Sequence, residues 1–302
     1  MKTLAIMINY NCNNNCIFCA NRRLRQHKAS SLEEIKRRIK FFSGIRGKTG
    51  LIFSGGEPLI SPKFFKLFHS IQGEKLQRIC VQSNGRMLCY ESLVKKLKKI
   101  AHSKLYFFIS FHFPNSRLYR KYCQADGFQQ TMKGIRNIVK NNCDIITNTL
   151  IMKPNLAYLK DIIKMLKKEG VKEMQLKFID GKWLKNGYRE YVPKYSECVP
   201  IIREIIEQNR DIKIWANEVP PCVLGEKYKK NIVSCVDRER FLFDSKREVK
   251  PMEEILSHRL VLPNCKGCIY KYLCGGVRKE YVQTYGIKEF NPIIKTSLSE
   301  IE

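Results

Sequence analysis

A strand–helix alternation that repeats six times constrains the fold more than any other feature of this sequence. Short apolar runs rich in β-branched and aromatic residues alternate with longer segments whose apolar residues recur at helical spacing. These patterns predict strands at 4–10, 50–54, 78–83, 105–112, 144–152 and 173–179. They predict helices at 32–42, from Pro62 onwards, and near 91–101, 128–140, 156–169 and 198–208.

Local signals fix several of the helix ends. Ser31 and Glu34 have the spacing of a capping box at the start of the first helix. Ser61 precedes a proline at the first helical position of the second helix, and Gly170 ends the fifth.

Strands joined by crossover helices enter the sheet in the same direction, so six such units predict a parallel sheet. Six units are fewer than a closed eight-unit barrel needs, which predicts an α/β fold with a partial (βα)6 barrel and functional loops at the carboxyl ends of its strands. After about residue 211 the rhythm breaks, although 212–217 could form one more strand. We expect the barrel to occupy 1–210 and a small cysteine-rich domain, stabilised by bound metal, to occupy 211–302.

Charge and cysteine content narrow the class of protein. The chain has 56 Lys and Arg against 28 Asp and Glu, a net charge of +28. The basic residues interleave with apolar ones at helical spacing, which favours solvated helix faces over a nucleic-acid site, so nucleic acid is a possible partner that we do not favour. No apolar run could span a membrane and no secretory signal is present, which predicts a cytoplasmic protein. Thirteen cysteines in that compartment favour metal or cluster binding over disulfides.

Three of these cysteines, Cys12, Cys16 and Cys19, lie in one loop directly after the first predicted strand. Three thiolates can hold three corners of an iron–sulfur cluster and leave one iron open. A zinc site would need a fourth ligand, and His27 is the nearest downstream histidine, so a zinc site is the alternative.

The C-x3-C-x2-C spacing after the first strand of a partial barrel, with Phe18 before the third cysteine, resembles the radical S-adenosylmethionine (SAM) superfamily. The resemblance implies that Cys12, Cys16 and Cys19 hold a four-iron, four-sulfur cluster. It also implies that the open iron of that cluster binds the amino and carboxylate groups of SAM.

Three further segments match the family in order on successive strands. Gly55, Gly56 and Glu57 resemble its GGE motif, in which two glycines permit close backbone approach, and Glu57 is expected to accept a hydrogen bond from the SAM amino group. Ser83 and Asn84 resemble its S/T-N-G segment, and an ordinary Asn-Gly turn is the alternative there.

The fourth to sixth strands carry the remaining candidates. Ser110 resembles the family residue that faces the ribose or methionine end of SAM. His112 is either an acid/base catalyst that faces the substrate or a histidine at the barrel rim whose hydrogen bonds are made within the protein. We favour the second interpretation. Asn148, Gln175 and Lys177 alternate with apolar neighbours, so they share one face of the sheet, either the barrel interior or its outside. Interior placement would make them pocket residues, and we expect Asn148 to bind the cofactor.

A second group of cysteines follows the barrel. The spacing of Cys265, Cys268 and Cys274 resembles the auxiliary-cluster region of radical SAM enzymes with twitch or SPASM domains, and a zinc knuckle is the alternative. The resemblance implies a second four-iron cluster with Cys222 as its fourth ligand, or Cys235 if Cys222 is merely packed. The other five cysteines are expected to be small buried hydrophobes without chemistry: Cys80, Cys89, Cys123, Cys143 and Cys198.

The resemblance implies a radical SAM enzyme of oxidoreductase or maturase type. Reductive cleavage of SAM would give a 5′-deoxyadenosyl radical that abstracts hydrogen from the substrate. We expect an external electron donor of flavodoxin or ferredoxin type and a peptide or protein side chain, or a small metabolite, as substrate. The first strand begins at residue 4, so we expect no N-terminal leader-binding domain, and a separate protein would fill that role. The alternatives are an RNA-modifying radical SAM enzyme and a non-catalytic zinc or cluster module that binds nucleic acid.

Overall fold

The computed structural model describes residues 1–47, 49–101, 104–181, 184, 187–234, 240–243, 248–249 and 256–294. Seven parallel strands follow one another in chain order across its main sheet. They are β1 (Lys2–Asn9), β2 (Thr49–Gly55), β3 (Arg78–Ser83), β4 (Leu105–Ser110), β5 (Asp144–Ile151), β6 (Glu173–Phe178) and β7 (Lys213–Asn217). This confirms the predicted parallel sheet and the possible extra strand at 212–217.

The other edge of the sheet receives strands from the later part of the chain. β8 (Arg240–Phe243) pairs in parallel with β1, and β9 (Glu248–Val249) pairs antiparallel with β8. Because β7 and β8 both join the barrel sheet, the sheet includes residues beyond 210. The predicted boundary between the barrel at 1–210 and a separate domain at 211–302 stays a prediction.

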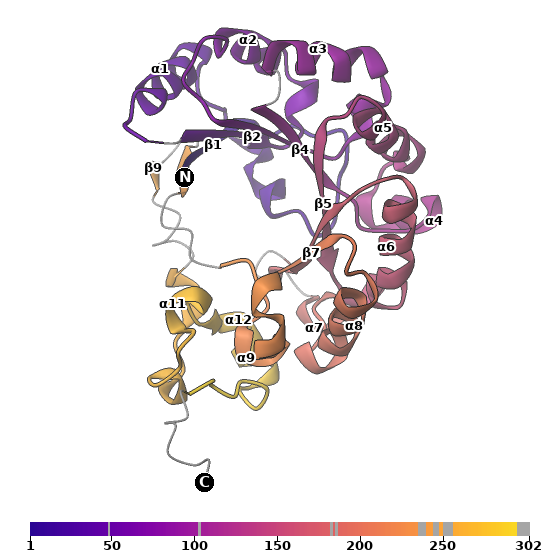
Figure 1. Cartoon of the computed structure of the whole chain (residues 1–302), viewed down its shortest axis with the longest axis vertical. Coiled ribbons are helices and arrows are strands. Elements are labelled where there is room, and N and C mark those ends of the chain that lie inside the picture. Colours follow the sequence, from indigo (N-terminus) through magenta and orange to yellow (C-terminus); the bar gives the residue numbers. More distant parts are fainter. Residues whose placement is uncertain are drawn as a thin grey trace.

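Helices cover the convex side of this curved sheet (Figure 1). The predicted helices are observed as α1 (Leu32–Ser43), α2 (Pro62–Ser70), α3 (Glu91–Ala101), α5 (Phe128–Lys140), α6 (Leu159–Lys168) and α8 (Tyr195–Gln208). Between the predicted helices lie two that we did not predict: α4 (Ser116–Cys123), after β4, and the short α7 (Tyr188–Tyr191), after β6. Short 3-10 segments follow several strands, among them η1 (Ala20–Gln26), η2 (Pro58–Ile60), η3 (Arg86–Cys89) and η5 (Lys153–Tyr158).

Two of the predicted helix-end signals are confirmed, one at the start of α1 and one at the end of α6. The Ser31 hydroxyl accepts a hydrogen bond from the Glu34 backbone N–H at 3.1 Å, which caps α1. Gly170, just after α6, has a φ of +85°, a conformation that glycine adopts at little cost.

The two faces of the sheet differ in chemistry. On β4, Leu105, Phe107 and Ile109 are buried in the main core between the sheet and the helices. The alternate residues, Tyr106 and Phe108, belong to the opposite face, where they pack against a separate small cluster. Towards the carboxyl ends of the strands that concave face becomes polar, and it is the face that a barrel interior presents to a ligand.

The cysteine-rich region lies against the end of the barrel that carries α7 and α8 (Figure 1). It contains α9 (Pro221–Leu224), η7 (Glu226–Asn231), η8 (Pro263–Cys265), α11 (Lys271–Cys274) and α12 (Lys279–Tyr285). It also contains the antiparallel pair β10 (Arg259–Leu260) and β11 (Val277–Arg278). Tyr281 is buried against Phe178 and Tyr195, so an aromatic cluster joins this region to the barrel.

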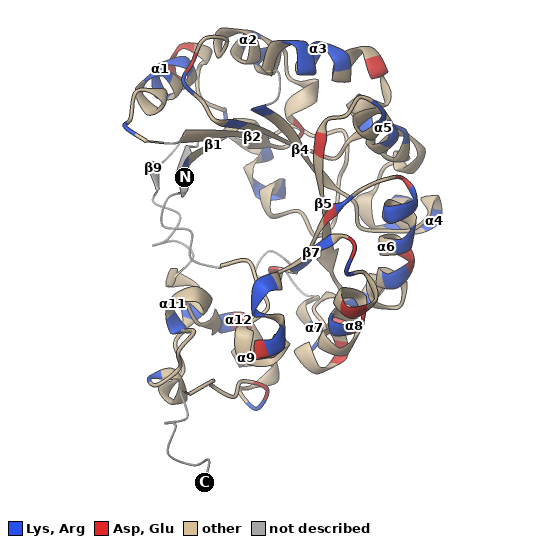
Figure 2. Cartoon of the chain, in the orientation of Figure 1, with Lys and Arg blue, Asp and Glu red and all other residues tan. Residues whose placement is uncertain are grey.

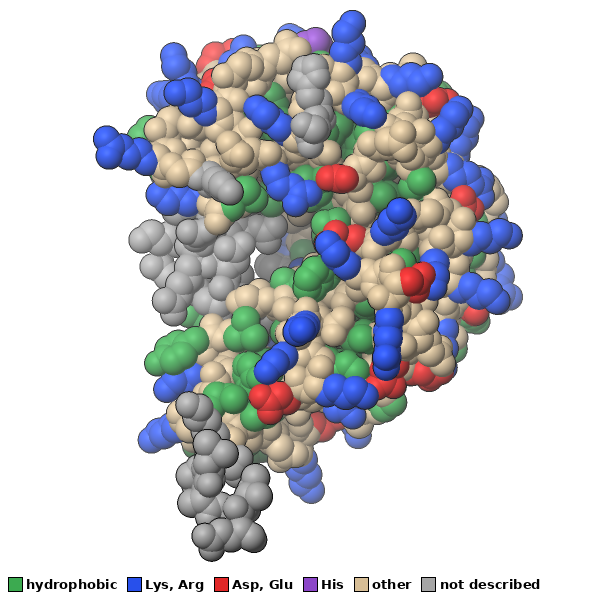
Figure 3. All heavy atoms as spheres, viewed as in Figure 1, with side chains coloured by type: hydrophobic (Ala, Val, Ile, Leu, Met, Phe, Trp, Pro, Cys, Tyr) green, Lys and Arg blue, Asp and Glu red, His purple; other side chains and the backbone are tan. Residues whose placement is uncertain are grey.

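The positive charge is distributed along the helices. Figure 2 shows Lys and Arg along α1, α2, α3, α5 and α6. On the face seen in Figure 3, basic side chains are scattered among acidic and apolar ones and do not gather into one patch. Among the helices of the described ranges, none combines the length and the apolar character that crossing a bilayer requires.

Candidate functional site

The loop that follows β1 carries Cys12, Cys16 and Cys19, and all three side chains are half-buried. Two backbone hydrogen bonds dock this loop on the end of α4: Asn15 N–H donates to the Cys123 carbonyl at 2.9 Å, and Ile17 N–H donates to the Tyr122 carbonyl at 3.1 Å. The position of the three thiols is therefore set by elements far apart in the sequence.

Two arginines hold the asparagines of the same loop. Arg25 donates to the Asn14 carbonyl at 2.7 Å and to the Asn15 side-chain oxygen at 2.8 Å. Arg86 donates to the Asn13 carbonyl and, at 3.0 Å, to the Asn14 side-chain oxygen. Two guanidinium groups beside a loop of three thiols suit a bound group of negative charge.

The environment of each thiol affects its ionisation differently. Burial raises the pKa of Cys12 to about 11 and also raises the pKa of Cys19. The pKa of Cys16 is lowered, first of all by a hydrogen bond with the Cys123 thiol. A metal centre deprotonates a thiol that coordinates it, so iron could hold even the buried thiols as thiolates.

Gly55 and Gly56 pack against the cysteine loop itself. Gly56 N–H donates to the Asn9 carbonyl at 2.8 Å, and a Cβ on Gly56 would lie 2.0 Å from the Asn11 carbonyl oxygen. Gly55 has a φ of +134°, and a Cβ there would lie 2.2 Å from the Asn9 carbonyl oxygen. The two glycines predicted a close approach of backbone at this point. In the structure, the backbone that they approach is that of Asn9 and Asn11, at the start of the cysteine loop.

Glu57 is fully buried, at 0% exposure. Its carboxylate accepts hydrogen bonds from the Ser83 hydroxyl at 2.9 Å, the Asn84 N–H at 2.8 Å and the Leu59 N–H at 3.1 Å. Burial raises the pKa of Glu57 to about 7 against the effect of these donors. The Glu57 carboxylate joins the ends of β2 and β3, and its predicted contact with a ligand amino group stays a prediction.

Ser83 and Asn84 differ in their relation to the cysteine loop. The buried Ser83 hydroxyl donates to Glu57 and accepts from the Gly85 N–H at 2.9 Å, so it belongs to the loop framework. The Asn84 side-chain amide donates to the Asn13 side-chain oxygen at 2.6 Å and approaches the Cys12 sulfur at 3.6 Å. Asn84 therefore lies beside the Cys12 thiol, and its predicted place in the cofactor pocket stays a prediction.

Phe18 and His112 pack under the cysteine loop. Their rings meet edge to face at 5.1 Å, and both side chains are buried. His112 Nδ1 accepts a hydrogen bond from the Leu150 N–H at 3.1 Å, and burial lowers the pKa of His112 to about 3. His112 is thus a neutral, packed histidine, which agrees with the interpretation that we favoured. A contact of Phe18 with the cofactor stays a prediction.

The polar residues of the concave face lie side by side. Strand register places Ser110 beside Asn148, and Asn148 beside Gln175. The Gln175 side-chain amide donates to the Asn148 side-chain oxygen at 3.0 Å. Lys177 is two residues further along β6 on the same face. These four side chains form a polar surface at the carboxyl ends of β4 to β6.

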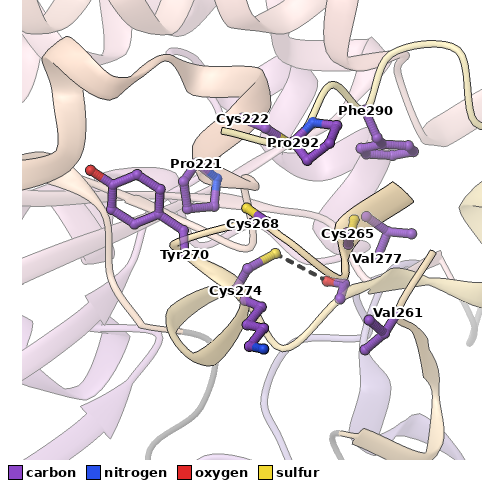
Figure 4. A pocket seen from close by; sticks show the side chains of 12 residues that line it. Pro221, Cys222, Val261, Cys265, Cys268, Tyr270, Cys274, Val277, Phe290 and Pro292 are labelled. Atoms are coloured by element: carbon purple, nitrogen blue, oxygen red, sulfur yellow. Dashed lines mark hydrogen bonds between the residues drawn. The ribbon is translucent and has the colours of Figure 1, made fainter. Parts of the chain in front are cut away.

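Four of the later cysteines line one pocket of about 440 Å³, which includes space open to solvent (Figure 4). They are the predicted set Cys222, Cys265, Cys268 and Cys274. The Cys274 thiol also donates to the Gly276 carbonyl at 3.4 Å, and burial raises the pKa of Cys222 to about 11. Cys235, the alternative fourth ligand, lies outside the described residues.

Within the described ranges, no group of three or more His, Cys, Asp or Glu side chains is gathered as closely as a single metal ion requires. No sequence pattern indicated Arg25, Arg86 or the asparagines that these arginines hold, although Arg86 directly follows the Ser-Asn-Gly segment. Cys123 was expected to be a buried cysteine without chemistry, and only the approach of α4 to the cysteine loop distinguishes its thiol from the other buried ones.

A partial barrel with three thiols in the loop after its first strand is the arrangement of a class of enzymes that bind an iron–sulfur cluster and SAM. The family model described as the radical SAM superfamily matches residues 6–172, more than half of the sequence. The chain belongs to the radical SAM superfamily.

Curated relatives and a solved structure extend this result. A probable GTP 3′,8-cyclase of Methanocaldococcus jannaschii is 27% identical over 69% of this chain and 67% of its own length. An AdoMet-dependent heme synthase of Methanosarcina barkeri is 28% identical over 56% of this chain, which spans about half of that relative. The solved structure of native anSMEcpe with bound AdoMet and Kp18Cys peptide has a TM-score of 0.69 and 16% identity, covering 92% of this chain and 89% of that one. This last likeness concerns the fold.

Proposed function

We propose that this radical SAM enzyme holds its SAM-binding four-iron cluster on Cys12, Cys16 and Cys19. The observation that carries the proposal is the loop itself: three half-buried thiols beside two guanidinium groups at the carboxyl end of β1. Three thiolates fit a cluster with one open iron. When bound, the cluster supplies an electron to SAM, and SAM supplies the 5′-deoxyadenosyl group that takes a hydrogen atom from the substrate.

The residues around the loop orient and enclose that site. Glu57 and Ser83 fix the ends of β2 and β3, so that Asn84 reaches the Cys12 sulfur. Phe18 and His112 fill the space beneath the loop and exclude water from it. Ser110 and Asn148, on the concave face, are proposed to contact SAM.

We also propose that Cys222, Cys265, Cys268 and Cys274 hold one auxiliary four-iron cluster in a twitch-like or SPASM-like domain. Four thiols that line one pocket are the support for this assignment. A radical SAM enzyme needs a reductant, and we propose a flavodoxin or ferredoxin as the external electron donor.

A peptide or protein side chain is the substrate class that we favour. The concave face offers uncharged hydroxyl and amide groups from Ser110, Asn148 and Gln175, which suit the hydrogen-bonding groups of a peptide backbone. The structure with Kp18Cys peptide resembles this chain along most of its length. The second candidate is a small metabolite such as a nucleotide, which the GTP 3′,8-cyclase relative favours.

The proposal is tested by anaerobic preparation with measurement of iron, sulfide and 5′-deoxyadenosine. We expect about eight iron atoms per chain from two four-iron clusters. The triple variant Cys12→Ala, Cys16→Ala, Cys19→Ala should keep about four and form no 5′-deoxyadenosine from SAM and dithionite. The double variant Cys265→Ala, Cys268→Ala should also keep about four but still cleave SAM. Reductive SAM cleavage by the triple variant would contradict the assignment.

A further inference from the structure

Cys123, the last residue of α4, is a fourth thiol at the N-terminal cysteine loop. Its side chain is only 2% exposed. The two residues that flank Cys16 donate backbone hydrogen bonds to the last two residues of α4: Asn15 to Cys123 and Ile17 to Tyr122, at 2.9 and 3.1 Å. These bonds hold Cys16 directly against Cys123.

The side chains of the two cysteines also meet. The Cys16 and Cys123 thiols are hydrogen-bonded to each other. A cysteine that binds iron does so as a thiolate, which carries no proton, whereas Cys123 keeps its S–H. In this arrangement Cys123 is the donor and the sulfur of Cys16 is the acceptor.

We propose that Cys123 is a positioning residue for the SAM-binding cluster, which donates an S–H···S hydrogen bond to Cys16 and raises the reduction potential of that cluster. The proposal rests on the assignment of Cys12, Cys16 and Cys19 as cluster ligands.

The physical reason is the charge that reduction adds. The reduced cluster carries one more negative charge, which is shared with its cysteine sulfurs. A hydrogen bond donated to such a sulfur stabilises the reduced form more than the oxidised form, and the low dielectric of a buried site strengthens the effect. Cys12 has its own donors in the Asn14 N–H, at 3.4 Å, and the Asn84 amide, at 3.6 Å. Cys123 supplies a thiol donor to Cys16, which also has a hydrogen bond with the Asn14 side chain.

The test is a redox titration of the full chain, prepared without air and followed by electron paramagnetic resonance. The signal that changes on addition of SAM identifies the N-terminal cluster. We expect a more negative midpoint potential in Cys123→Ala, and in Cys123→Val if the alanine variant does not fold. Cys123→Ser retains a hydroxyl donor and should lie between these variants and the wild type. Cys198→Ala, which removes an equally buried thiol from α8, should leave the potential unchanged.

The possible failures are distinguishable by the iron content. An unchanged midpoint potential in Cys123→Ala or Cys123→Val, with full iron content, would overturn this inference alone. If the wild type gave no SAM-sensitive signal and the Cys12, Cys16, Cys19 triple variant kept all the iron of the wild type, the assignment of the ligands would fail and this inference with it.

Discussion

At the scale of single residues, the site depends on buried polar groups whose partners come from other strands. Glu57 is the clearest case, because its carboxylate is fully buried and accepts hydrogen bonds from residues at the end of β3. Burial disfavours the charged form more strongly than these donors stabilise it, so the pKa of Glu57 is raised to about 7. The framework of the cysteine loop therefore contains a group that titrates near neutral pH.

We predict that Glu57 makes stability decrease as the pH rises from about 4.5 to about 7. The pKa is higher in the folded chain than in the unfolded chain, so the folded chain binds more protons in that range. The free energy of unfolding of the wild type, minus that of Glu57→Gln, should fall by on the order of 3 kcal/mol between pH 4 and pH 8. Denaturant titrations at a series of pH values measure this difference. A difference independent of pH would show that Glu57 does not change protonation on folding.

At the scale of elements, the loop after β1 is shaped by the loop after β2. Gly55 and Gly56 lie against the backbone of Asn9 and Asn11, where a side chain has no room. Backbone hydrogen bonds reinforce the contact, since Gly56 N–H donates to the Asn9 carbonyl and Glu57 N–H to the Asn11 carbonyl. The position of Cys12 therefore depends on two glycines that lie more than forty residues further along the sequence.

Gly56→Ala should displace the cysteine loop, because the new Cβ would lie 2.0 Å from the Asn11 carbonyl oxygen, a backbone atom. We expect this variant to lose the iron of the N-terminal site and keep that of the auxiliary site, as measured by iron analysis. Gly44→Ala is the matched control, since a Cβ there meets its nearest atom at an ordinary 3.5 Å. Full iron content in Gly56→Ala would show that the loop tolerates the displacement.

The elements themselves could largely be predicted from the sequence, because strand and helix periodicity is a local property. The contacts between loops could not, because they depend on how distant segments meet. Cys123 illustrates the difference: its sequence neighbourhood is that of any buried cysteine, and only the packing of α4 on the cysteine loop brings it to Cys16. The sequence motif singled out Glu57, but its burial depends on strands β2 and β3 lying side by side.

At the scale of the whole molecule, a buried ion-pair network joins the barrel to the cysteine-rich region. Glu218, just after β7, pairs with Arg259 and, at 3.0 Å, with Arg278. Arg278 also pairs with Asp180, just after β6, at 2.7 Å. Burial opposes the charge on Glu218, but Arg278, Arg259 and Lys177 overcome it and lower the pKa of Glu218. Arg259 donates to the Gly276 carbonyl at 2.7 Å, so the network reaches the segment that follows Cys274.

Glu218→Gln should destabilise the fold by about 3–5 kcal/mol, because it leaves two buried guanidinium groups without their shared carboxylate. We also expect the variant to lose auxiliary iron before N-terminal iron when it is titrated with a chelator. Denaturant unfolding and iron analysis measure the two effects. Glu204→Gln, which breaks an exposed pair with Lys160, should leave the unfolding midpoint nearly unchanged. A Glu218→Gln variant as stable as the wild type would show that the network does not anchor the region.

The most direct test of the central claim is the electron paramagnetic resonance spectrum of the reduced Cys265→Ala, Cys268→Ala variant, recorded with and without SAM. If Cys12, Cys16 and Cys19 hold a four-iron cluster with one open iron, SAM will bind that iron and change the g values of the signal. A cluster signal that stays the same at saturating SAM would mean that no iron is open, and it would contradict this account of the site.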